Sequence, residues 1–134
     1  MILPEAVGSR HGVQAFLVRV RHGDGTTSEY VVASAHHPRL SDDVCESLAP
    51  NLRSHFNDAC VCFTTESDEG SASVLVPSAE HPRFQPMAAA AAVATTMRVC
   101  GWDESATIQV HFRPSGEAIR LSPRLEAGEW VAYP

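Results

Sequence analysis

The sequence predicts an α+β domain in which a curved antiparallel or mixed sheet wraps around one central, alanine-rich helix. Three observations lead to this expectation. Strand-like runs occur in pairs around turn signals, residues 87–100 have the strongest helix propensity in the chain, and these residues are apolar on nearly every face. Such a helix must be buried on most sides, and only a strongly curved sheet can surround it.

The composition is that of a globular protein and argues against two classes of partner. The chain has 134 residues, a net charge of −6 and 44% hydrophobic residues, which fits one domain over 1–134. All ten basic residues are arginines and they are scattered along the sequence. Because nucleic-acid and membrane-surface binding both depend on clustered positive charge, we expect neither partner.

The sequence also predicts a cytoplasmic location. The longest apolar tract, 87–94, is far shorter than the roughly 18 residues that a membrane span requires. The first residues have neither the basic region nor the apolar run of a signal peptide. The four cysteines are therefore expected to be reduced, and Cys60 and Cys62 to share one face of a strand as small buried side chains.

The first half of the chain predicts a hairpin followed by a short helix. Residues 1–12 are expected to be a flexible lead-in, and 14–21 and 28–34 to pair around Asp24-Gly25. Ser41 is a good N-cap, and Val44, Leu48 and Leu52 recur as one apolar stripe. Since proline disrupts helix interiors, Pro50 predicts a helix confined to 41–49.

The second half predicts another hairpin, the central helix and three strands. A turn at 67–70 separates strands 59–65 and 71–77, and 78–85 is expected to be irregular. Pro86 suits the first helical turn, and Gly101 ends the helix. The last expected strands are 107–113, 118–122 and 129–132.

This order and three segments resemble the diaminopimelate epimerase superfamily, and most of all its phenazine-biosynthesis-type isomerases. Residues 40–43 (Leu-Ser-Asp-Asp) are similar to the family's Leu-Ser-Asp-Glu helix start, and 56–63 resemble its Leu-Ser-Glu-Thr-Ala-Phe-Val segment. Residues 76–80 (Val-Pro-Ser-Ala-Glu) resemble its Thr-Pro-Thr-Gly-Glu segment. The resemblance covers residues 13–133 and implies a central helix inside a curved sheet.

The resemblance also implies a partner, because family members carry two such halves in one chain with the active site between them. A two-fold homodimer of this single half would restore the pair, and two-fold dimers are the commonest oligomers. A monomer with an open mouth and a different partner chain that supplies the second half are the alternatives.

The family's catalytic signatures are absent. Its racemases carry Cys-Gly-Asn-Gly where the central helix begins, and its isomerases carry Gly-His-Pro; this chain has Gln85-Pro86-Met87. Cysteine-based racemisation is therefore not expected. Asp58 falls on the glutamate that acts as general acid/base in the isomerases, so the resemblance implies proton transfer by Asp58. The alternative is an ordinary turn before a strand.

The remaining candidates surround the start of the central helix. Its N-terminus favours an anion, and Arg83 and Gln85, with Met87 and Ala88, are predicted to hold a substrate carboxylate; capping by the helix's own loop and water is the alternative. His81 and His55 are the histidines closest to this end and are candidate proton shuttles, or else solvated loop residues. No metal or cofactor is expected, since the seven histidines lack helical i, i+4 spacing.

These features predict a small, cofactor-independent isomerase or cyclase-like enzyme that acts on a carboxylated metabolite by proton transfer. A role in bacterial secondary metabolism follows from the family analogy alone. Two other functions are open. The chain is either a non-catalytic protein that binds a small molecule or stabilises a partner, or one subunit of a heteromeric isomerase.

Overall fold

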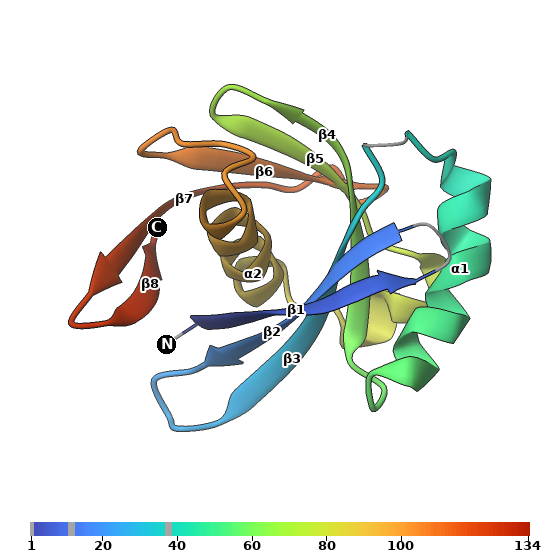
Figure 1. Cartoon of the computed structure of the whole chain (residues 1–134), viewed down its shortest axis with the longest axis horizontal. Coiled ribbons are helices and arrows are strands. Elements are labelled where there is room, and N and C mark those ends of the chain that lie inside the picture. The colour runs from blue at the N-terminus through green and yellow to red at the C-terminus, as the bar shows by residue number, and fades with distance from the viewer. Residues whose placement is uncertain (1, 11–12, 37–38) are drawn as a thin grey trace.

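A computed structural model of the chain describes residues 2–10, 13–36 and 39–134. It contains eight strands, two α-helices and one 3₁₀ helix within these ranges (Figure 1). In chain order they are β1 (Ile2–Arg10), β2 (Val13–Arg21), β3 (Thr27–Ser34), α1 (Asp42–His55), β4 (Cys60–Asp68), β5 (Ser71–Leu75), η1 (Ser78–Arg83), α2 (Pro86–Val99), β6 (Ile108–Arg113), β7 (Ala118–Glu126) and β8 (Glu129–Tyr133).

The strands form one curled, mixed sheet in which each strand lies beside its neighbours in the sequence. The pairs β3–β4 and β5–β6 are parallel, and the other pairs are antiparallel. The first and last strands meet through a single pair, Ile2 with Trp130, which closes the sheet into a barrel. Helix α2 lies inside this barrel and α1 packs outside it (Figure 1).

The alanine-rich sequence of α2 explains its central place. Residues 88–97 are all buried, and their short side chains let the surrounding strands approach the helix backbone. Strand side chains alternate between the two faces of the sheet: Val32 and Cys62 face the α2 core, whereas Val31 and Phe63 face the α1 core. Because both faces of β3 and β4 are covered there, residues 30–33 and 60–63 are apolar without a break.

The expected α+β class, with a curved mixed sheet around an alanine-rich helix, is confirmed. Every predicted strand is present to within a few residues, and α2 differs from the expected 87–100 by one residue at each end. Neither described helix reaches the length and apolarity that spanning a membrane would require.

Three local expectations differ from the structure. Residues 2–10, expected to be a flexible lead-in, form strand β1 along β2, while residues 1, 11 and 12 lie outside the described ranges. The segment 78–83, expected to be irregular, is the 3₁₀ helix η1. Helix α1 does not stop at residue 49 but continues through Pro50 to His55.

The extension of α1 has a packing cause. Pro50 removes one backbone hydrogen bond, but the next turn buries Leu52 and leads to the buried Phe56 in the outer core. The buried stripe is also rotated from the predicted one, because Cys45 and Ala49 are buried while Val44 is exposed. Tertiary burial therefore outweighs the local disruption.

Candidate ligand-binding site at the start of the central helix

The N-terminus of α2 is not capped by a side chain. Gln85, in extended conformation, occupies the cap position without a side-chain hydrogen bond, and Pro86 is the first helical residue. The backbone N–H groups of Met87 and Ala88 therefore lie at the positive end of the helix without a side-chain acceptor. This arrangement favours a negatively charged group in front of the helix.

Two cavities open on either side of this helix start, and Gln85 lines both. The first, the Arg83 cavity, has a volume of about 350 Å³, and the second, the Met87 cavity, of about 240 Å³. Each wall carries an arginine, Arg83 in the first and Arg21 in the second. The other side chains used below are Ser28, Glu29, Tyr30 and Cys60 in the Arg83 cavity, and His22, Met87 and Ala88 in the Met87 cavity.

Two side chains that line the Arg83 cavity, Tyr30 and Cys60, are uncharged at neutral pH. Burial, followed by the neighbouring charge of Glu80, raises the pKa of the Cys60 thiol to about 12. Burial also raises the pKa of Tyr30 to about 12, against the opposing effect of a backbone hydrogen bond with Gln85. Both groups stay protonated and uncharged at neutral pH, and each already has a partner in the protein, Glu80 for Cys60 and the Gln85 backbone for Tyr30. Glu29 also lines this cavity, but its carboxylate lies 3.5 Å from Nε of Arg19.

A buried carboxylate lies behind this wall. Glu80, in η1, has a side chain with no solvent exposure, and Arg53 Nη1 of α1 donates to its Oε1 at 3.0 Å. Its Oε2 lies 3.8 Å from Arg83 Nη1 and has no hydrogen-bond partner among the described residues. Glu80 thus connects α1, η1 and the Arg83 cavity.

The four residues that were predicted to bind substrate lie around the start of α2 but are divided between the two cavities. Arg83 and Gln85 line the first cavity, and Gln85, Met87 and Ala88 line the second. Met87 is half exposed, whereas the side chain of Ala88 is buried and its contribution is its backbone.

The three predicted proton-transfer residues lie elsewhere. Asp58 is exposed in the turn between α1 and β4, with a left-handed backbone (φ 63°) and its N–H donated to the Arg53 carbonyl. His55 is exposed at the end of α1, with its ring edge-on to Phe56. His81 donates from Nε2 to the Val76 carbonyl at 2.9 Å and lines a different, largely apolar cavity beside Arg113. None of the three is among the residues that line the two cavities at the α2 start.

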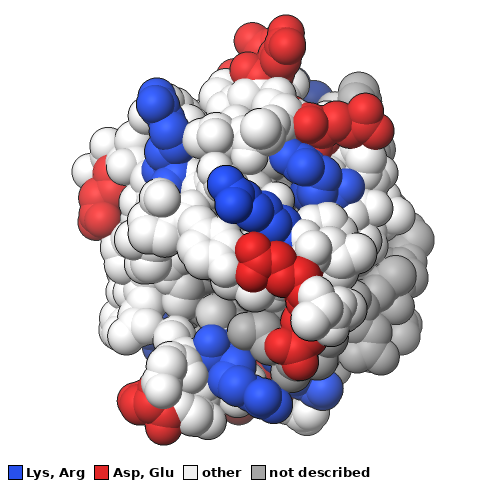
Figure 2. Space-filling model, turned by 90° about the vertical axis from the view of Figure 1, so that its left-hand side faces the viewer, with Lys and Arg blue, Asp and Glu red and all other residues white. Residues whose placement is uncertain are grey.

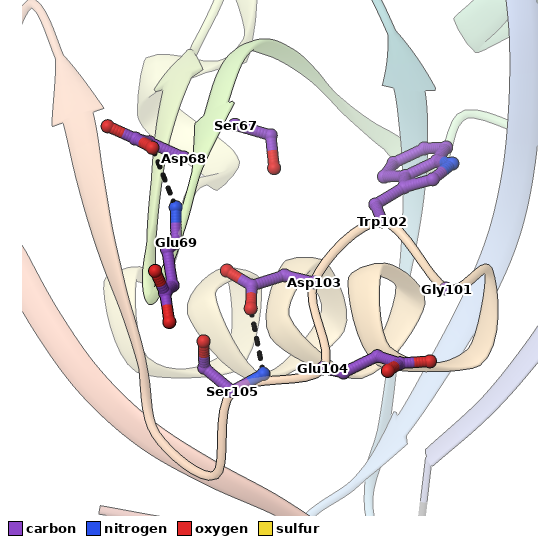
Figure 3. A pocket seen from close by; sticks show the side chains of 8 residues that line it. All are labelled: Ser67, Asp68, Glu69, Gly101, Trp102, Asp103, Glu104 and Ser105. Atoms are coloured by element: carbon purple, nitrogen blue, oxygen red, sulfur yellow. Dashed lines mark hydrogen bonds between the residues drawn. The ribbon is translucent and has the colours of Figure 1, made fainter.

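A larger cavity, about 600 Å³, lies beyond the opposite end of α2 and is acidic. Figure 3 shows Asp68, Glu69, Asp103 and Glu104 around it. Two of these carboxylates are occupied by the chain itself, since Asp68 accepts from Glu69 N–H and Asp103 from the N–H groups of Ser105 and Gly70, each at 2.8 Å. They fix the loops at this end and would repel an anionic ligand.

The exterior offers no competing charged site on the face that carries the β7–β8 hairpin. Acidic and basic side chains alternate there, and neither forms a continuous patch (Figure 2). Across the described ranges, no three histidine, cysteine, aspartate or glutamate side chains come together as a metal site would need.

The sequence analysis missed Glu80, Tyr30, Cys60 and Arg21. Glu80 is part of the segment 76–80 that resembles the isomerase motif, and its position in the family-like motif was the signal that could have marked it. Tyr30 and Cys60 come from strand interiors, which on sequence alone are indistinguishable from core. No protein-family model matches this chain, and no curated protein is detectably similar to it in sequence.

Proposed function

We propose that this protein binds a small carboxylated molecule at the start of α2. The observation that carries the proposal is the uncapped helix N-terminus, which opens between two cavities whose walls each carry an arginine. A carboxylate held beside Gln85, which lines both cavities, would accept from the Met87 and Ala88 N–H groups on one side and pair with Arg83 on the other. The cavity volumes, about 350 and 240 Å³, suit a metabolite-sized ligand rather than a polymer.

The chemistry of the wall favours a carboxylate over a cation or a purely apolar ligand. Guanidinium and carboxylate groups match in planar geometry and form charge-assisted hydrogen bonds. Tyr30 and Cys60 stay protonated at neutral pH, so they add no negative charge to the wall. The side chain of Arg83 is 41% exposed, so a ligand that covers it removes water from the ion pair and strengthens it.

The test compares ligand binding in matched arginine variants. Acetate, succinate, benzoate and 2-hydroxybutyrate are titrated into the protein and followed by saturation-transfer NMR, and the tightest binder is measured by calorimetry. Arg83→Gln should weaken binding by at least about tenfold, because it removes a charged hydrogen-bond donor. The control Arg39→Gln removes an exposed arginine that pairs with Glu66 and should leave affinity unchanged. Equal affinity in the wild type and Arg83→Gln would refute the site.

The second candidate function is an isomerase or cyclase-like enzyme in which Asp58 transfers a proton to or from the bound carboxylated molecule. Two observations favour it: the likeness of residues 13–133 to the diaminopimelate epimerase superfamily, and consecutive left-handed backbone at Asn57 and Asp58. Such conformations concentrate at functional sites. Asp58 is the last residue of the turn 56–58, two positions before Cys60 on the cavity wall.

This candidate is tested by proton exchange. The probe carboxylate is incubated with the protein in D₂O, and loss of its carbon-bound hydrogen is followed by NMR. Asp58→Asn should abolish the exchange, because an amide cannot take up and release the proton, and it should leave the affinity for the probe unchanged, because the size of the side chain is kept. If exchange persists in Asp58→Asn, Asp58 is not the acid/base. If the wild type binds the probe but shows no exchange, the protein is a non-catalytic binding protein.

A further inference from the structure

Glu80 is a fully buried carboxylate behind the wall of the candidate site. Arg53 donates to its Oε1 at 3.0 Å, and the Cys60 thiol interacts with the same carboxylate. Oε2 has no nitrogen or oxygen hydrogen-bond donor among the described residues. Buried orphan acceptors are rare in native proteins and call for a specific reason. An apolar side chain in η1 would avoid this cost.

A second arginine, Arg83 of the candidate site, also approaches the Glu80 carboxylate. Arg83 Nη1 lies 3.8 Å from Oε2, which is within ion-pair range but too long for a hydrogen bond. Arg53 approaches the same carboxylate from α1. Glu80 therefore lies between two guanidinium groups. That of Arg53 is fixed by a hydrogen bond, and that of Arg83 is held by charge alone.

We propose that Glu80 is a positioning residue for the carboxylate site. It holds the Arg83 guanidinium against the cavity wall, where a long and partly exposed side chain would otherwise sample many rotamers. When a carboxylate binds, Arg83 closes the remaining distance and donates to Oε2 while its other N–H groups face the ligand. This inference rests on the proposed carboxylate-binding function, and it adds Glu80 and the Arg53 contact to the site.

The positioning role predicts an effect opposite in sign to simple electrostatics. Glu80 is negative and lies behind the wall of a site for anions, so removal of its charge should tighten carboxylate binding if only the local potential matters. If Glu80 orients Arg83, the same removal should weaken binding. A purely structural role lowers stability and leaves the affinity of the folded fraction unchanged.

The experiment measures affinity for succinate and the order of the Arg83 side chain in three variants. Glu80→Gln keeps an oxygen for Arg53 but removes the charge. Glu80→Asp keeps the charge and withdraws it by one methylene, and it replaces Glu80→Gln as the decisive variant if the latter does not fold. Glu46→Gln is the control, because Glu46 anchors the start of η1 through Ser78 and does not line the cavity.

We expect succinate to bind Glu80→Gln and Glu80→Asp at least about fivefold more weakly than the wild type, and Glu46→Gln within about twofold. The heteronuclear NOE of Arg83 Nε should fall in both Glu80 variants, and Arg39 Nε serves as the mobile reference. Unchanged or tighter succinate binding overturns the inference. If the wild type binds no succinate, the proposed function fails. The positioning role is then decided by the heteronuclear NOE of Arg83 Nε in the Glu80 variants. An unchanged NOE overturns that role, and a lowered NOE supports it.

Discussion

Two buried acidic residues, one at each end of α2, illustrate how differently a carboxylate is used within one small protein. Asp103 is satisfied by the chain itself, with Oδ1 accepting from Ser105 and Oδ2 from Gly70, each at 2.8 Å. Glu80 has one oxygen hydrogen-bonded to Arg53 and the other 3.8 Å from Arg83, too far for a hydrogen bond. The Asp103 hydrogen bonds join the β4–β5 turn to the loop after α2. Glu80 Oε2, in contrast, can still accept a hydrogen bond from Arg83 when a ligand binds.

Asp103 gives the clearest prediction at the residue scale. Burial alone would raise the pKa of its carboxyl, but hydrogen bonds from Ser105 and Gly70 outweigh burial and lower it. A lowered pKa contributes stability that is present above the unfolded value of 3.8 and is lost as the pH falls through the folded value. Asp103→Asn should therefore lower the free energy of unfolding by about 1–3 kcal/mol near neutral pH.

Urea unfolding of the wild type and Asp103→Asn at several pH values checks this expectation. The difference in unfolding free energy should be constant at neutral pH and shrink below about pH 4, where the wild-type carboxyl becomes protonated. A difference that persists unchanged into acid would show that the charge of Asp103 contributes nothing.

The sequence located the residues that line the cavities at the start of α2 better than it located the predicted proton-transfer residues, which lie elsewhere. Arg83, Gln85, Met87 and Ala88 adjoin the helix start in the sequence, so locating α2 also located them. Glu80 depends instead on Arg53, which lies 27 positions earlier in a different helix. A contact of that separation is set by how η1 packs on α1, and no local pattern in the sequence records it.

At the scale of elements, close packing constrains the side chains of α2 most strongly. Its central alanines have no exposed surface, and the barrel strands pack against them on all sides. The sequence predicted this helix because both propensity and all-round apolarity agreed on it. The predicted end of α1 was wrong. Pro50 suggested that the helix stops at residue 49, but the burial of Leu52 favours its continuation to His55.

Enlarging one alanine of α2 tests how tightly the barrel encloses it. Ala92→Leu should lower the free energy of unfolding by about 1–3 kcal/mol, because the added carbons have no free space. Val99→Leu, on the same helix at a residue that is 45% exposed, should change it by less than about 0.5 kcal/mol. Thermal or urea unfolding provides the measurement, and a wild-type stability for Ala92→Leu would contradict the close packing.

At the scale of the whole molecule, the order of elements was predictable and the closure of the sheet was not. Turn signals and apolar runs placed seven of the strands, whereas β1 has no comparable pattern and was expected to be a lead-in. The parallel pairs β3–β4 and β5–β6 each need a crossover connection, which runs outside the barrel through α1 in one case and inside it through α2 in the other. These crossovers place the start of α2 at the barrel end where the two cavities open.

The homodimer expected from the sequence stays a prediction at this scale. If two copies join around the helix starts, native mass spectrometry of the protein at micromolar concentration should show twice the chain mass of 14.5 kDa. A bare monomer would remove the shared-site arrangement and leave either the single-chain cavities or a different partner chain.

The central claim is that the start of α2 binds a carboxylate, and backbone amide NMR tests it most directly. Acetate or succinate is titrated into uniformly ¹⁵N-labelled protein at constant ionic strength, with matched sodium chloride as the control. The account predicts saturable shifts concentrated at the amides of Met87 and Ala88 and at the Arg83 Nε–H group, with none at Glu104 and Ser105 at the acidic end. Shifts that are absent, that do not saturate or that centre on the acidic end would contradict it.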